Sequence, residues 1–317
     1  MRETSPQSTL LGMANLQFTL SSGRRLGVTA LGNPLARHVV VLCHPAPGSG
    51  VFDPDPLITS DRDVHIVAID RPGYGSSDPL RSGEWPTVVG AANDISEYLH
   101  AEEGTAGALN LSVIDSVSVV GWSAGGRVAM ALAAKHPSLV RRAVVIATPA
   151  PNEEIEWMPA EFADASQKLT SLPAEQAKEK LSGLFASRMA DQIPSSDSDE
   201  PAPLDQLGIS SADAAALSGP GVQERLELML HDAYRQGTVG VVADILSYTA
   251  QPWGFDLADV HAKTLLVYGQ ADPNIDHAHA QWYRYNLPDA EVELVPDVGH
   301  LVIVPAWDRV LAHLTDG

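Results

Sequence analysis

The chain has 317 residues, a formal net charge of −20 and 44% hydrophobic residues, so it can form one large α/β domain with an inserted segment, or two domains. This composition excludes a disordered protein, and the negative charge would repel nucleic acid and anionic membrane surfaces. No apolar run is long enough to span a bilayer and the polar start lacks the layout of a signal peptide, so we expect a cytoplasmic protein.

The first part of the chain is predicted to form an edge hairpin and then buried strands. Residues 14–32 alternate apolar and polar side chains around a Ser-Gly pair, a pattern typical of a β-hairpin at a sheet edge. Residues 39–43 and 65–69 are apolar throughout, as expected of parallel strands that are buried on both faces. Residues 87–100 have the apolar spacing of a helix.

A serine follows the next predicted strand at a tight turn. Residues 117–120 favour a strand, and the Ala-rich segment after Gly125 favours a helix. The pentapeptide 121–125, Gly-Trp-Ser-Ala-Gly, fits the nucleophile elbow, in which a strained serine lies between strand and helix and nearby backbone leaves no room for a Cβ on either glycine. We therefore predict that Ser123 is a nucleophile, next to a helix N-terminus that favours developing negative charge.

The remaining strands complete the predicted sheet. Residues 143–147, 264–268 and 292–295 each read as a buried strand. Strands separated by helices indicate an α/β fold with a doubly wound, mostly parallel sheet, whose active groups lie at the carboxyl ends of the strands.

The stretch between the predicted strands 143–147 and 264–268 differs from the rest of the chain. It contains only helical patterns, such as 174–190, 222–236 and 239–249. An insertion of about a hundred helical residues after one strand is typical of a lid over an active site. We expect three parts, namely the first part of an α/β core, an all-helical cap and the second part of the core, with the bounds 1–149, 150–252 and 253–317.

An activated serine needs a base and a carboxylate that orients the base. In this architecture the three residues follow in the order Ser, acid, His, each just beyond a strand. Asp272 and His300 follow the last two predicted strands, so we predict Asp272 as the orienting carboxylate and His300 as the general base. The weaker candidates for the acid are Asp276, Asp297, Glu153 and Glu154.

Two backbone amides are predicted to stabilise the oxyanion. The first is the N–H of Ala124, which follows the nucleophile. The second should come from residues 44–50, where Ala46 is the best donor because Pro45 and Pro47 have no N–H. The histidines lack metal-site spacing, Cys43 is alone and no glycine-rich phosphate loop follows the first strands, so we expect neither a metal nor a cofactor.

Five motifs together resemble the α/β-hydrolase superfamily, in its cap-bearing branch. They occur in the family's order, and the resemblance covers about residues 25–150 and 252–317. The motifs are 44–49 (His-Pro-Ala-Pro-Gly-Ser), 70–77 (Asp-Arg-Pro-Gly-Tyr-Gly-Ser-Ser), 121–126 (Gly-Trp-Ser-Ala-Gly-Gly), 269–272 (Gly-Gln-Ala-Asp) and 299–300 (Gly-His).

The resemblance implies a Ser-Asp-His triad, an oxyanion hole from Ala46 and Ala124, and a cap that holds much of the substrate pocket. Most relatives have Gly where this chain has Pro45, whose fixed φ bears on the orientation of the Ala46 amide. Relatives that act as haloalkane dehalogenases or epoxide hydrolases have Asp at the elbow, so Ser123 argues against both activities.

The leading hypothesis is a serine hydrolase that cleaves a small, largely apolar carboxylic ester or lactone through an acyl-enzyme. A proline iminopeptidase-like aminopeptidase is the first alternative, because Glu153, Glu154 and Glu156 could meet a free amine. A carbon–carbon bond hydrolase and a non-enzymatic ligand-binding relative are the others. We expect a small-molecule substrate, no nucleic-acid or membrane partner, and a monomer or homodimer.

Apolar residues of the elbow and the cap are candidates to line the substrate pocket. They are Trp122, Trp157, Met158, Phe162, Phe185, Met189, Met229, Tyr248 and Trp253.

Overall fold

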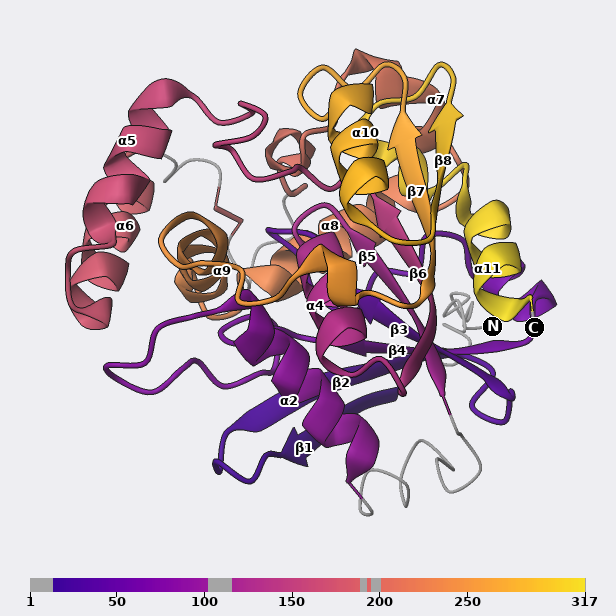
Figure 1. Cartoon of the computed structure of the whole chain (residues 1–317), viewed down its shortest axis with the longest axis horizontal. Helices are drawn as coiled ribbons and strands as arrows, with labels where there is room; N and C mark the ends of the chain where they lie inside the picture. The colour runs from indigo at the N-terminus through magenta and orange to yellow at the C-terminus, as the bar shows by residue number, and fades with distance from the viewer. Residues whose placement is uncertain (1–13, 102–115, 189–192, 195–200, 317) are drawn as a thin grey trace, which may run out of the picture.

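The computed structural model describes residues 14–101, 116–188, 193–194 and 201–316, which surround one mixed sheet (Figure 1). The sheet has eight strands in the order β1-β2-β4-β3-β5-β6-β7-β8. β1 and β2 pair antiparallel to their neighbours and the other pairs are parallel, which confirms the mostly parallel sheet expected from the sequence. The strands are β1 (Ala14–Thr19), β2 (Arg25–Gly32), β3 (His38–Cys43), β4 (Val64–Ile69), β5 (Val117–Trp122), β6 (Val140–Ile146), β7 (Lys263–Gly269) and β8 (Ala290–Val295).

The predicted hairpin and buried strands are confirmed to within a few residues. β1 and β2 form the hairpin in a register that pairs Ala14 with Ala30 and Thr19 with Arg25. In β3, alternate side chains enter two separate apolar cores, with Val39 and Val41 on one face and Val40 and Leu42 on the other. This two-sided burial explains why the strand is apolar at every position.

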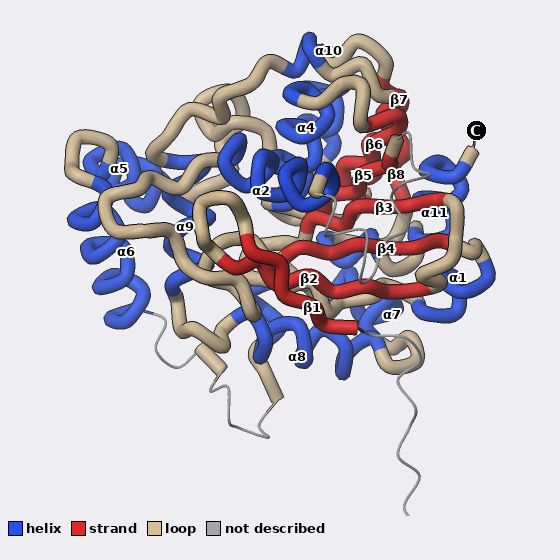
Figure 2. Tube along the Cα trace, turned by 90° about the horizontal axis from the view of Figure 1, so that it is seen from below, coloured by secondary structure: helices blue, strands red, loops and turns tan. Residues whose placement is uncertain are grey.

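Helices cover both faces of the sheet, so that it is enclosed between two layers (Figure 2). α2, α4 and α10 contribute to one apolar core, and α11 contributes to the other. The helices of these layers are α1 (Pro56–Asp61), α2 (Val88–His100), α4 (Gly125–Lys135), α10 (His277–Asn286) and α11 (Trp307–Thr315).

The described chain between β6 and β7 is helical, which fits the predicted insertion, and we call residues 160–250 the cap. Within it, α9 packs against α2 of the core and against α5 and α6, which lie farther from the sheet (Figure 1). The division at residues 149/150 and 252/253 stays a prediction. The cap helices are α5 (Ala160–Leu169), α6 (Ala174–Arg188), α7 (Ala214–Leu217), α8 (Val222–Ala233) and α9 (Val239–Thr249), with 3-10 turns η3 (Leu204–Leu207) and η4 (Ser211–Asp213).

Two further 3-10 turns complete the described chain, η5 (Leu257–Asp259) before β7 and η6 (His300–Ile303) after β8. In the ranges given above, no helix has the length and apolar character that a membrane crossing requires. The polar start of the chain and Met189 lie outside the described residues.

Candidate active site

Ser123 lies in the turn between β5 and α4 with a positive φ of 52°, a strained conformation for a residue with a side chain. Its N–H donates to Ile146 O (2.8 Å), which ties the turn to the neighbouring strand. A Cβ on Gly121 would lie 2.4 Å from Gly125 O, and a Cβ on Gly125 would lie 2.1 Å from Cys43 O. Both glycines are therefore required by close backbone contacts, as the sequence predicted.

The structure brings Ser123, His300 and Asp272 together at the carboxyl ends of β5, β8 and β7. His300 Nδ1 lies 2.8 Å from Asp272 Oδ2, and His300 Nε2 lies 3.0 Å from Ser123 Oγ. Because an ionised carboxylate can only accept, Nδ1–H donates to Asp272 and leaves Nε2 to accept from the serine hydroxyl. The three side chains thus form the hydrogen-bonded chain that activates a serine.

Asp272 is held in its ionised state although its side chain is buried. Burial by itself would raise the pKa of Asp272, but the hydrogen bond from His300 and those from two backbone N–H groups outweigh it and lower the pKa below its ordinary value. Asp272 Oδ1 also accepts from the N–H groups of Ile275 (2.9 Å) and Asn274 (3.0 Å). These contacts keep a fixed negative charge beside the imidazole.

The other carboxylates that the sequence left open do not contact His300. Asp276 caps α10 by accepting from Ala278 N–H (2.9 Å). Glu153 and Glu154 are exposed on the segment after β6, and Asp297 is exposed in the turn before His300. Asp272 is therefore the carboxylate that the fold places against the imidazole.

Ala46 and Ala124 lie with Ser123 and His300 on one cavity of about 320 Å³. The loop that carries Ala46 is held by Arg71, which donates from Nη1 to His44 O (2.6 Å) and from Nη2 to Pro45 O (2.7 Å). Burial and the nearby Arg71 charge lower the pKa of His44 well below its ordinary value, so its Nε2 is free to accept from Arg71 N–H (3.1 Å). The carbonyl of Pro45 is thereby fixed.

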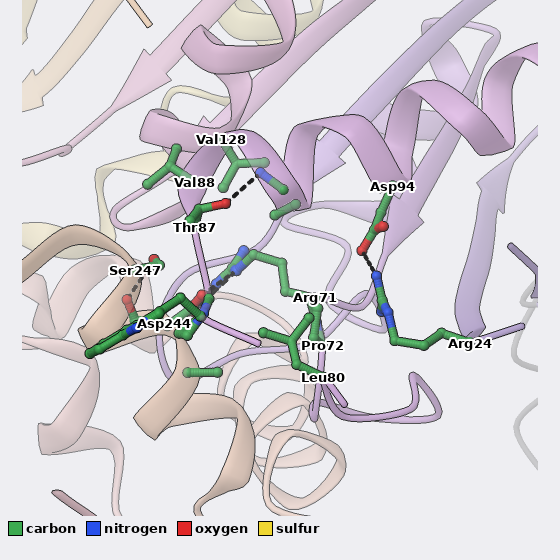
Figure 3. Close-up of a pocket in the computed structure, with 15 residues that line it drawn as sticks. Arg24, Arg71, Pro72, Leu80, Thr87, Val88, Asp94, Val128, Asp244 and Ser247 are labelled. Carbon is green, nitrogen blue, oxygen red and sulfur yellow. Dashed lines mark hydrogen bonds and ion pairs between the residues drawn. The ribbon is translucent and has the colours of Figure 1, made fainter. Parts of the chain in front are cut away.

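Arg71 also joins this loop to the cap. Its guanidinium forms a buried ion pair with Asp244 of α9 (Figure 3), with Nε 2.8 Å from Oδ1 and Nη2 2.5 Å from Oδ2. A small cavity of about 100 Å³ lies beside the pair, between α2, α4 and α9. The position of α9 is therefore coupled to the position of the predicted oxyanion loop.

A second cap residue, Asp213, supports the histidine. It is fully buried, and its Oδ1 accepts from Gly299 N–H (2.9 Å) and Leu301 N–H (3.0 Å), the residues on either side of His300. The sequence analysis did not identify the Arg71–Asp244 pair or the contact of Asp213 with the backbone around His300. In both cases the partners lie far apart in the chain, and the local sequence around Asp213 shows only the capping box that it forms with Ser210.

The predicted pocket residues fall into different surroundings. Trp157 and Tyr248 line the cavity that holds Ser123, and together with Met158 and Trp253 they line a second, neighbouring cavity of about 720 Å³. Phe162 is only half-buried and packs against the core, without lining either of these two cavities.

Three of the pocket candidates are core residues instead. Trp122, Phe185 and Met229 are buried in the apolar core and line neither of these two cavities, so their contact with a substrate stays a prediction. The ring of Trp122 points beneath the elbow, where its Nε1–H donates to His300 O (3.0 Å). Apolar side chains on cap helices bury more surface against one another than against an open cavity, and the sequence pattern is the same in both cases.

Arg127 lines both cavities, and sequence reasoning missed it as well. In the sequence, Arg127 stands out only as a single charged residue within the otherwise apolar first turns of α4. In the part of the chain that the structure describes, no cluster of three or more His, Cys, Asp or Glu side chains is arranged to hold a metal ion.

Comparisons with known proteins agree with this fold. The model of the alpha/beta hydrolase fold family matches residues 38–306. A pimeloyl-[acyl-carrier protein] methyl ester esterase of Aromatoleum aromaticum is 29% identical over 188 residues, which cover 59% of this chain and 67% of that protein. A 2-hydroxy-6-oxononadienedioate/2-hydroxy-6-oxononatrienedioate hydrolase of Burkholderia vietnamiensis is 24% identical over 242 residues, which cover 74% of this chain and 69% of that one.

Among solved structures, a thermophilic esterase from Thermogutta terrifontis has the same fold. It superimposes with a TM-score of 0.64 at 19% sequence identity, covering 94% of this chain and 95% of the esterase. At this level of identity the likeness concerns the fold alone.

Proposed function

The chain belongs to the α/β hydrolase fold family, and from this premise we propose that it is a serine hydrolase of small, largely apolar carboxylic esters or lactones. The observation that carries the proposal is the continuous hydrogen-bonded chain from Ser123 through His300 to Asp272. The Ser123 end of this hydrogen-bonded series lines a cavity, rather than lying on the protein surface or in the core. The relative from Aromatoleum aromaticum, a methyl ester esterase, supports an ester as the substrate.

The proposed reaction is acyl transfer to Ser123 and then to water. His300 accepts the serine proton as Oγ attacks the ester carbonyl, and the resulting oxyanion accepts hydrogen bonds from the N–H groups of Ala46 and Ala124. His300 then gives the proton to the leaving alcohol. In the second half, His300 takes a proton from water, the hydroxide attacks the acyl-enzyme, and the acid leaves as the proton returns to Ser123.

A carbon–carbon bond hydrolase is the second candidate. It is supported by the relative from Burkholderia vietnamiensis, a hydrolase of oxo-dienedioates. The same triad serves either reaction, so the bond that is cleaved depends on which substrate the cavity accepts.

A labelling experiment tests the serine, with a matched serine as the control. A fluorophosphonate probe should label the native chain and not Ser123→Ala, while the control Ser171→Ala, which changes an exposed serine, should label normally. Ser123→Ala should also abolish hydrolysis of p-nitrophenyl acetate with little change in the melting temperature. Activity that survives Ser123→Ala would refute the proposed nucleophile.

A substrate panel then separates the candidate reactions. We expect p-nitrophenyl esters of graded chain length to be hydrolysed faster than prolyl or alanyl anilides and faster than vinylogous diketones, which report on carbon–carbon cleavage. Preference for the diketones would favour the second candidate.

A further inference from the structure

Arg127 is a buried cation at the junction of the two cavities. It follows Ser123 by one helical turn on α4, it is 2% exposed, and it lines both the cavity that holds Ser123 and His300 and the second cavity of about 720 Å³. Arg127 has no role in the reaction proposed above.

The charge of Arg127 has no counter-ion among the described residues. Nη2 donates to Pro149 O (3.0 Å), whereas Nε is buried without a hydrogen-bond partner. Two other buried arginines, Arg24 and Arg71, each face a carboxylate instead. A buried charge without a partner is costly, so an unpaired guanidinium beside a cavity indicates a position that a ligand completes.

Aromatic rings fix the orientation of this guanidinium. Its Cζ lies 4.4 Å from the ring centre of Tyr248, 5.3 Å from that of Trp253 and 5.5 Å from that of Trp157. Rings over the face of a guanidinium leave its N–H edge as the part that donates hydrogen bonds. A planar carboxylate matches that edge, because its two oxygens can accept two parallel hydrogen bonds from it.

We infer that the site takes esters carrying one free carboxylate, which binds Arg127 while the ester carbonyl lies at Ser123; this rests on the proposed function. Ser123 and Arg127 line the same cavity of about 320 Å³, which suits a short chain between the ester and the carboxylate. Glu153 and Asp164 line the second cavity and disfavour a second negative charge there. The substrate class is therefore short monoesters of dicarboxylic acids.

Binding to Ser123→Ala protein tests the inference without turnover. The probes are monomethyl adipate and methyl adipamate, which have the same shape but carry a carboxylate and a neutral amide, respectively. Calorimetry should give a dissociation constant about tenfold or more lower for the acid, the gain expected from hydrogen bonds to a charged group. The preference should fall to about one in Ser123→Ala/Arg127→Met and persist in Ser123→Ala/Arg37→Gln, which removes an exposed cation.

Equal binding of the two probes to Ser123→Ala, or a preference that survives Arg127→Met, would overturn the inference. If the Met variant fails to fold, as judged by circular dichroism, Arg127→Gln is measured with the same criterion. Hydrolysis of p-nitrophenyl acetate by the native chain is scored separately. Activity without a carboxylate preference refutes only this inference, and a preference without activity refutes only the proposed function.

Discussion

At the scale of single residues, the reactivity of Ser123 depends on the state of its neighbours. The serine is one link in a chain whose far end, Asp272, is kept ionised inside the protein because His300 and two backbone N–H groups bind it. The carboxylate fixes which imidazole nitrogen carries the proton, and in the proposed reaction it stabilises the imidazolium that forms during attack. The charge of Asp272, rather than its shape, is therefore what the proposed reaction requires.

Replacing Asp272 by Asn tests this requirement. We expect kcat for p-nitrophenyl acetate to fall by about 10³- to 10⁴-fold, because a neutral amide does not stabilise the imidazolium. Asp276→Asn is the matched control, since it changes a nearby carboxylate that caps α10 and should leave kcat within about twofold. Equal losses in the two variants would argue against Asp272 as the orienting acid.

Asp53 has a pKa that couples stability to pH. Burial raises its pKa from 3.8 to about 6, although the hydroxyl of Thr59 donates to it. Because the folded-state pKa is raised, the protonated form stabilises the fold below pH 3.8, and this contribution is lost as the pH rises through about 6. Asn at this position stays neutral and keeps the acceptor for Thr59.

The melting temperature of Asp53→Asn relative to the native chain should therefore increase as the pH rises from about 4 to about 7. The exposed acid Asp61 provides the control, because the difference for Asp61→Asn should stay nearly constant over that range. A constant difference for Asp53→Asn would contradict the buried, raised pKa.

At the scale of elements, the cap helix α9 and the predicted oxyanion loop are linked by a single buried ion pair. Arg71 donates to the carbonyls of His44 and Pro45 and at the same time pairs with Asp244 of α9 (Figure 3). Removing one member of such a pair leaves a buried charge, whereas removing both leaves none. Stability and activity should therefore respond differently to single and double replacement.

Arg71→Met alone should destabilise the protein by about 3–5 kcal/mol, because it leaves the buried Asp244 without its partner. It should also lower kcat, because the loop loses the hydrogen bonds that Arg71 donates to it. Arg71→Met/Asp244→Leu should recover most of the free energy of unfolding, measured in urea, but not kcat, because the loop carbonyls still lack their donor. Arg25→Met, which breaks an exposed pair with Asp78, should change the free energy of unfolding far less than Arg71→Met does, because water already solvates both charges. Recovery of both quantities in the double variant would show that the loop does not need Arg71.

At the scale of the whole molecule, the net charge of −20 dominates the long-range electrostatic energy. Like charges repel across the folded surface, and salt reduces that repulsion because the Debye length shortens. The melting temperature at pH 8 should therefore rise by a few degrees between about 0.02 M and 0.5 M NaCl. Near the isoelectric point of about 4.7 the same salt should have a much smaller effect, and an equal effect at both pH values would contradict the explanation.

Much of the architecture is determined by local sequence. The edge hairpin, the strands, the elbow and the order of Ser123, Asp272 and His300 were all predictable, because each depends on the period of apolar residues or on glycines at a turn. Parallel strands end at a common edge, so residues placed just beyond them were expected to meet. The distances among these three residues agree with that expectation.

The role of each buried charge was decided only by the tertiary structure. Arg71 and Asp244 are 173 residues apart, and Asp213 lies 86 residues from Gly299, so no local pattern links them. The sequence also did not separate Trp157 and Tyr248, which line the cavity, from Trp122 and Met229, which lie in the core. Helical periodicity specifies which face of a cap helix is apolar, but whether that face meets core, cavity or the cation of Arg127 depends on how the cap packs on the sheet.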